Sequence, residues 1–142
     1  MKRDKLNKIY ITHCSAKKND ALENTKKKVT PDKLYTATPL VRFINKCKKK
    51  KVRWAIFSDK YGVVFPHTKI AWYEKHPNDI TDEEFSRLVN ESAKKLRKFD
   101  RVYFYGNHKS HYFHRRYKLL IRELIRRGIN VIKICSIYDI KG

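Results

Sequence analysis

Four short apolar runs along the chain predict strands. They cover residues 9–12, 54–58, 102–105 and 131–135. Each run is nearly continuous rather than alternating, which is typical of parallel strands that are buried on both faces of a sheet. The hydrophobic pattern therefore predicts a mainly parallel sheet of four strands.

Three helical patterns lie between these runs. The first has Thr38 as N-cap and Pro39 as the first helical residue, and it ends in a lysine run at 46–51. Cations at that end complement the helix dipole. The second helix opens with a capping box that begins at Thr81. The third covers roughly 111–127 and is followed by a glycine, which is common directly after a helix.

The alternation of strands and helices predicts an α/β fold, built as a three-layer sandwich. The chain length fits one domain that spans residues 1–142. Two segments do not follow a regular pattern. Residues 19–33 are polar and rich in lysine, and residues 65–80 contain prolines and adjacent aromatics. Both are expected to be irregular excursions from the sheet.

Charge is unevenly distributed along the chain, whose net charge is +21. Residues 1–53 carry 17 Lys and Arg against 4 Asp and Glu, residues 54–99 carry 8 against 7, and residues 100–142 carry 10 against 3. The excess therefore sits at the two ends, around a nearly neutral middle. Such a distribution of positive charge favours nucleic acid or another polyanion as a partner. The alternative is a solvated lysine surface of the kind found in thermophilic proteins.

Several classes of protein are disfavoured by what the sequence lacks. It has no run of 18 apolar residues, so no membrane partner is expected, and its basic start lacks the apolar stretch of a signal peptide, which favours a cytoplasmic location. Three widely spaced cysteines form no C-x-x-C pair. Nucleotide-binding glycine motifs and the hydrolase nucleophile motif are absent. No cofactor and no metal site is expected.

The first candidate site follows the first strand. Small residues at a strand end expose backbone amides, and neighbouring lysines add positive charge. This composition predicts that Cys14, Ser15 and Lys17 contact an anionic ligand, because ligands of open α/β sheets bind at the carboxyl ends of strands. The alternative is an ordinary turn with solvated lysines.

The second candidate is the turn after the second strand. Ser58 and Asp59 carry hydrogen-bonding groups and are predicted as catalytic residues, while Lys60 would hold a phosphate. Gly62 can adopt a positive φ that other residues resist. The alternative is a tight turn that packs Tyr61 into the core.

Two further segments carry candidate ligand contacts. Trp72 and Tyr73 are adjacent aromatics that could stack on a base, although aromatics more often pack into a core. Asn107, Arg115 and Arg116 follow the third strand and are predicted to contact phosphate, the alternative being a solvated basic helix face.

Part of this pattern resembles known families. The residues that carry the resemblance are Cys14 to Lys18, Leu34, Tyr35, Phe43, Trp54 to Val64, Pro66, Ile70 and Tyr73. Together they resemble a small domain of unknown function found in archaea, bacteria and phages, some members of which are labelled as related to queuine tRNA-ribosyltransferase. The turn around Tyr61 and the downstream Pro66 and Tyr73 are also similar to the peroxide-stress protein YaaA family and to the uracil-DNA-glycosylase-like domain of archaeosine synthase.

The resemblance implies a sandwich related to uracil-DNA glycosylases, with its site at the strand ends. Site residues implied by matching positions are Cys14, Ser15, Lys17, Tyr35, Ser58, Lys60, Tyr61 and Gly62. The sequence as a whole favours a nucleic-acid-associated protein that binds a nucleotide or base of tRNA or DNA, with base modification or repair as its activity. Two alternatives stay open: a non-catalytic DNA- or RNA-binding protein, and a transferase acting on free nucleotides or nucleosides.

Overall fold

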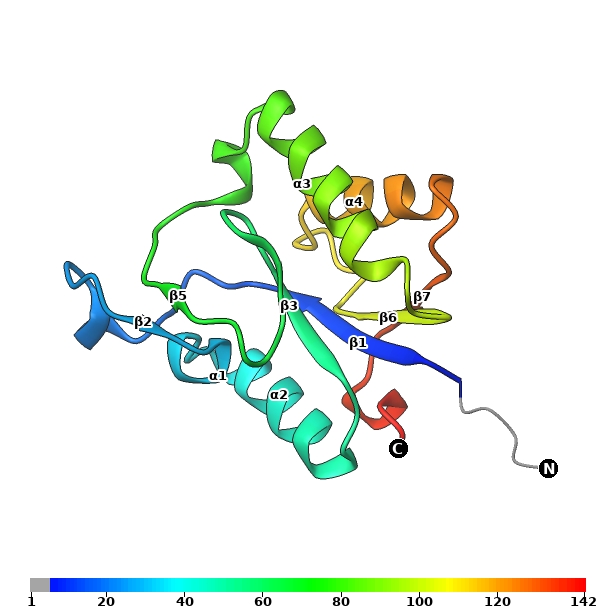
Figure 1. The fold of residues 1–142 in the computed structure, drawn as a ribbon, viewed down its shortest axis with the longest axis horizontal. Coiled ribbons are helices and arrows are strands. Elements are labelled where there is room, and N and C mark those ends of the chain that lie inside the picture. The colour runs from blue at the N-terminus through cyan, green and yellow to red at the C-terminus, as the bar shows by residue number, and fades with distance from the viewer. Residues whose placement is uncertain (1–5) are drawn as a thin grey trace.

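A computed structural model describes residues 6–142 and shows a central sheet between two layers of helices (Figure 1). The strands of this sheet are β1 (Lys8–His13), β3 (Trp54–Ser58), β4 (Gly62–Val64), β6 (Arg101–Tyr105) and β7 (Val131–Ile134). Their spatial order is β4-β3-β1-β6-β7. Neighbouring strands pair in parallel, except for β4, which is antiparallel to β3. The expected α/β class is confirmed.

The sheet has five strands, so the prediction of four was wrong. All four predicted strands are present within a residue at each end. The additional strand, β4, has three residues and forms a hairpin with β3, which makes it too short for its hydrophobic pattern to be recognised. Gly62 at its start has φ of +76°, as the sequence predicted for this turn.

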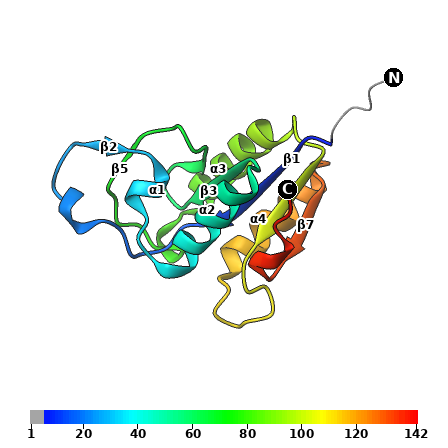
Figure 2. The same cartoon turned by 90° about the horizontal axis from the view of Figure 1, so that it is seen from below.

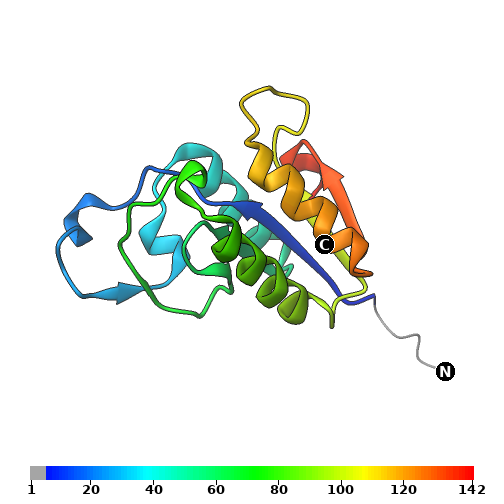
Figure 3. The ribbon, with the colours of Figure 1, turned by 90° about the horizontal axis from the view of Figure 1, so that it is seen from above.

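Helices cover both faces of the sheet. Helix α2 (Thr38–Lys50) lies on one face, together with the short α1 (Pro31–Leu34) and the C-terminal turn η3 (Ile137–Asp139) (Figure 2). Helices α3 (Asp82–Leu96) and α4 (Arg115–Arg126) lie side by side on the other face (Figure 3). This arrangement confirms three layers.

The helix starts are set by their caps. The predicted capping box of α3 is confirmed, since Thr81 Oγ1 accepts from the N–H of Glu84 and Glu84 Oε1 accepts from the N–H of Thr81, both at 3.1 Å. Helix α4 begins four residues later than predicted, because the ring of His114 caps the N–H of Arg116 at 3.0 Å.

The two irregular segments contain short elements. Strands β2 (Lys28–Val29) and β5 (Ile70–Ala71) pair as a small antiparallel sheet beyond the carboxyl ends of β1 and β3 (Figure 1). The turns η1 (Asp20–Leu22) and η2 (Pro77–Asp79) flank it in the chain. This excursion covers part of the edge where strand-end sites form.

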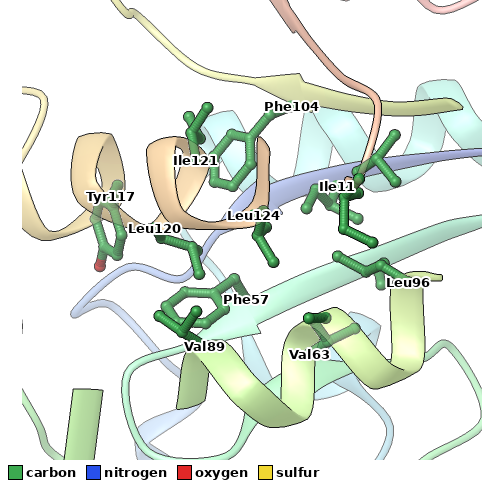
Figure 4. Close-up of a cluster of buried hydrophobic side chains, with 14 of the residues drawn as sticks. Ile11, Phe57, Val63, Val89, Leu96, Phe104, Tyr117, Leu120, Ile121 and Leu124 are labelled. Atoms are coloured by element: carbon green, nitrogen blue, oxygen red, sulfur yellow. The ribbon is translucent and has the colours of Figure 1, made fainter. Parts of the chain in front are cut away.

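Alternation along the strands divides the core into two clusters. Ile11, Phe57 and Phe104 face α3 and α4, where they pack against Leu120 and Leu124 (Figure 4). The intervening positions face α2, and the residues of that second cluster include Tyr10, Phe43, Ile44, Trp54 and Ile56. Both faces of the sheet are thus buried, as its continuous apolar strands indicated.

Truncation of a buried side chain of α4 tests this packing. Leu120 is fully buried, and we expect Leu120→Ala to lower the free energy of unfolding by about 2–5 kcal/mol, because it leaves a cavity. Ile125 on the same helix is 49 % exposed, so Ile125→Ala should change stability by no more than about 0.5 kcal/mol. Urea denaturation measures both. Equal losses for the two variants would contradict the orientation of α4.

Candidate functional site

A crevice opens where the sheet changes its direction of winding. The chain leaves β1 toward α2 on one face and leaves β6 toward α4 on the other, so the two loops diverge. Ligands of open α/β sheets bind at such a point, outside the carboxyl ends of the strands. The crevice has a volume of about 520 Å³. Its lining residues are Thr12, His13, Ser15, Ala37, Pro39, Leu40, Tyr105, Gly106, Asn107 and Cys135.

The N-terminus of α2 forms one wall of the crevice. Its N-cap residue is Ala37, not the predicted Thr38, and within the described residues no side chain caps it. The first amides of a helix have no intrahelical acceptor, and they carry the positive end of the helix dipole. Pro39 removes one of these amides, while those of Thr38 and Leu40 remain. This wall suits an anion.

His13 lines the crevice and was not among the site residues predicted from the sequence. Its Nδ1 donates to the carbonyl of Cys14 at 2.8 Å, and its ring stacks on Tyr117 at 4.4 Å between centroids. Burial lowers the pKa of His13, so the ring is neutral near pH 7. A donating Nδ1 leaves Nε2 as an acceptor, and among residues 6–142 this atom makes no hydrogen bond. The place of His13 at the end of a predicted strand was the available signal.

Beneath the crevice lies a cluster of buried polar groups. Asp59 is 3 % exposed, and its Oδ1 accepts from the hydroxyl of Tyr117 at 2.8 Å. Cys14 is also buried, and its Sγ accepts from the backbone N–H of Asp59 at 3.4 Å. These contacts join β1, β3 and α4, so the cluster ties the two core faces together at the strand ends.

Burial changes the acid–base properties of this cluster. It raises the pKa of Asp59, an effect that the hydrogen bond from Tyr117 partly offsets. It also raises the pKa of the Cys14 thiol to about 12, with a further rise from the charge of Asp59. Cys14 is therefore a neutral thiol and not an activated nucleophile at physiological pH.

A second set of buried groups holds the excursion against the sheet. The hydroxyls of Tyr35 and Tyr73 share a hydrogen bond of 2.6 Å. Lys18 is 5 % exposed, with Nζ donating to the carbonyl of Ala16 and lying 4.4 Å from the ring centroid of Tyr73. Burial lowers the pKa of Lys18. These contacts join the chain after β5 to the loop that leaves β1 and to the end of α1.

The predicted catalytic pair lies outside the crevice. Ser58 is fully buried, and its Oγ accepts from the N–H groups of Lys60 at 3.1 Å and Tyr61 at 3.0 Å, which stabilises the β3–β4 turn. Asp59 contacts Tyr117 as described above. Gly62 is buried in β4. The structure thus places this segment as a tight turn beside the site, and the side chain of Lys60 is exposed.

The aromatic pair is also packed into the core. Tyr73 is 4 % exposed, and in this arrangement its ring is covered by Lys18 and Tyr61. Trp72 is half-buried against the α2-side cluster. Neither ring presents an open face to the crevice.

The three residues predicted after β6 have different environments. Asn107 lines the crevice and is exposed. Arg115 is exposed at the first turn of α4. Arg116 instead links α4 to α3, because its Nη2 donates to the carbonyl of Ile80 at 2.9 Å and to Asp82 Oδ1 at 3.0 Å. Of the residues predicted after β1, Ser15 lines the crevice and Lys17 is exposed.

Histidines after β6 serve local structure. His108 Nε2 donates to the carbonyl of Phe104 at 2.8 Å, and His114 caps α4 while its Nε2 donates to Asn78 Oδ1 at 2.6 Å. Within the part of the chain that the structure describes, no group of three or more His, Cys, Asp or Glu side chains lies close enough to hold a metal ion.

The fold and the crevice define a doubly wound α/β protein with a hollow at the carboxyl ends of its strands. The chain belongs to a family of unknown function (DUF6884), whose model matches residues 9–134. This finding confirms the resemblance to a domain of unknown function. No curated protein and no solved structure matches the chain, so the likeness to YaaA and to uracil-DNA-glycosylase-like domains stays a prediction.

Over residues 6–142, none of the helices combines the length and the apolar character needed to span a bilayer.

The raised pKa of Asp59 predicts a pH-dependent stability. The folded state binds this proton more tightly than the unfolded state, whose Asp pKa is about 3.9. The contribution of Asp59 to the free energy of unfolding is therefore greatest below that pH and falls as pH rises through the folded pKa. We expect Asp59→Asn to gain stability relative to the wild type between about pH 3 and about pH 7 in urea denaturation.

Asp32 supplies a control of opposite sign. Burial tends to raise its pKa, but hydrogen bonds from Lys48 and Thr30 outweigh burial and lower it. Asp32 thus stabilises the fold above its unfolded pKa, and Asp32→Asn should lose stability relative to the wild type over the same rise in pH. A pH-independent difference for Asp59→Asn would contradict the raised pKa.

Thiol reactivity provides a second test of the cluster. Cys14 and Cys47 are buried, with pKa values raised to about 12 by burial, while Cys135 is exposed beside the crevice. Iodoacetamide should therefore modify only Cys135 in the native protein and all three cysteines in urea, as read by mass spectrometry. Rapid modification at Cys14 in the native Cys135→Ser variant would show that the cluster around Cys14 opens to solvent.

Proposed function

We propose that this protein binds one nucleotide of a nucleic acid in the crevice between β1 and β6. The observation that carries the proposal is the uncapped N-terminus of α2, which opens into a crevice of about 520 Å³ at the switch point of the sheet. A helix N-terminus of this kind binds phosphate through its amides and its dipole. The volume lies within the usual range of small-molecule sites.

Polar groups opposite α2 suit the rest of a nucleotide. The amide of Asn107 can both donate to and accept from a base edge, and the hydroxyl of Ser15 can do the same for a ribose or base. His13 is a further polar residue of the lining. The phosphate would thus lie at α2, with the base or sugar toward β1 and β6.

The distribution of charge favours a polymer over a free nucleotide. Every residue that lines the crevice comes from residues 1–53 or 100–142, the two basic parts of the chain. The fold thus brings both basic ends to one place. Exposed cations at Lys17, Lys109 and Arg115 belong to the loops that border the crevice or to the helix that follows. These side chains can contact neighbouring phosphates.

His13 favours an enzyme of base modification or repair over a purely binding protein. The ring of His13 is held through Nδ1, so a general base at this position would act through Nε2. The resemblance to the uracil-DNA-glycosylase-like domain adds the expectation that the bound base is unstacked from its neighbours.

Binding to oligonucleotides tests the proposal. Fluorescence anisotropy with labelled DNA and RNA should show affinity that falls with salt, with a slope of about 0.7–0.9 per phosphate contact. Asn107→Ala should weaken binding by roughly 2- to 10-fold, the effect of one lost hydrogen bond. We expect a loss of similar size for His13→Ala.

His67→Ala is the matched control for His13→Ala. His67 is an exposed histidine that lines a groove at the amino ends of the strands, away from the crevice. The His67→Ala variant should bind the oligonucleotides like the wild type. Equal effects of the two histidine variants, or unchanged binding by both His13→Ala and Asn107→Ala, would place the nucleic acid elsewhere. Binding of free nucleotides alone, insensitive to salt, would favour the transferase alternative.

A further inference from the structure

A second hollow continues from the crevice along α2. It has a volume of about 380 Å³ and shares Pro39, Tyr105 and Cys135 with the crevice. Its remaining lining residues are Thr38, Arg42, Ser136, Ile137 and Tyr138. The two hollows therefore form one groove, which leads from the end of β6 across the start of α2 to the C-terminal turn η3.

Tyr138 is an exposed aromatic at the far end of this groove. Its side chain is 73 % exposed, and Lys46 Nζ lies 5.3 Å from its ring centroid. Its backbone is fixed, because Ser136 Oγ caps its N–H at 3.1 Å and Ile140 two residues later is fully buried. The ring is thus held outward by a packed turn, with its face available to a ligand.

Cations accompany the ring along α2. Arg42 is exposed and lines the groove, and Lys46 lies one helical turn further on, beside Tyr138. Residues four apart share a helix face, so both charges follow the same path. An exposed aromatic next to a track of cations is the arrangement by which proteins hold single-stranded nucleic acid, with bases stacked on rings and phosphates on the cations.

We infer that this groove binds single-stranded nucleic acid, with the base next to the crevice nucleotide stacked on Tyr138 and the intervening phosphate held by Arg42 and Lys46. The inference rests on the proposed function and adds the class of polymer. Bases within a duplex are already stacked on their neighbours, so a ring can take one only where the strand is unpaired.

Tyr112 provides a matched control. It is 91 % exposed, more than Tyr138, and lies in the loop between β6 and α4. It lines neither the crevice nor the adjoining hollow. Non-specific stacking on exposed rings would involve both tyrosines, whereas the groove involves Tyr138 alone.

Fluorescence anisotropy with a labelled oligothymidylate of about ten residues tests the inference. Tyr138→Ala should weaken strand binding by about 5- to 150-fold, and Tyr138→Trp should preserve it. Tyr112→Ala should bind like the wild type. Arg42→Gln should lower the slope of the salt dependence by about 0.7. The wild type should prefer the single strand to the duplex of the same length.

Thymidine 5′-monophosphate separates this inference from the proposed function. Calorimetry should show that Tyr138→Ala leaves its affinity unchanged, while His13→Ala and Asn107→Ala weaken it. Wild-type strand affinity in Tyr138→Ala, equal losses in Tyr112→Ala, or a preference for duplex would each overturn the inference and leave the crevice site standing. Failure of His13→Ala and Asn107→Ala to weaken either ligand would overturn the proposed function itself.

Discussion

β1 is paired in parallel with β3 along one edge and with β6 along the other. Parallel neighbouring strands can be joined only by a crossover connection, and such crossovers are right-handed. The connection from β1 to β3 through α2 runs toward one edge of the sheet, and the connection from β6 to β7 through α4 runs toward the other. Because both are right-handed, α2 and α4 lie on opposite faces. The loops that leave β1 and β6 must then diverge. The crevice is the space between them, and the start of α2 forms its wall because the same crossover brings that helix back over the sheet.

The polar side chains at the end of β3, Ser58 and Asp59, stabilise the fold and do not line the crevice. The β3–β4 hairpin turns the chain back at once, and the β2–β5 segment covers the same edge, so Ser58 and Asp59 are buried rather than open to a ligand. A buried carboxylate is costly unless it is hydrogen-bonded. Tyr117 supplies that bond from α4, which makes the cluster a connection across the sheet. The cluster also contacts the crevice lining, because the ring of His13 stacks on Tyr117.

The two basic parts of the chain come together only in the folded protein. The two basic parts of the chain supply β1, α2, β6, α4 and η3, which surround the crevice and the groove, while the nearly neutral middle supplies β3, β4 and α3. Some cations are already used within the protein, as Lys48 is by Asp32 and Arg116 by Asp82. Arg42, Lys17 and Lys109 are exposed around the openings. A polyanion would meet these charges before reaching the crevice.

The sequence by itself determined the class of fold, four strands of the central sheet and the three long helices, because continuous apolar runs, helical stripes and caps are local signals. It also predicted a strand-end site, and two of the residues predicted for it, Ser15 and Asn107, line the crevice. Only the tertiary structure decided the rest. Whether a strand end is open depends on which loops cover it, and that is fixed by contacts between distant segments, such as Lys18 with Tyr73 and Asp59 with Tyr117. The sequence places His13 at the end of a predicted strand, but the surroundings of His13 and Tyr138 depend on how α2, α4 and η3 pack, which no local pattern records.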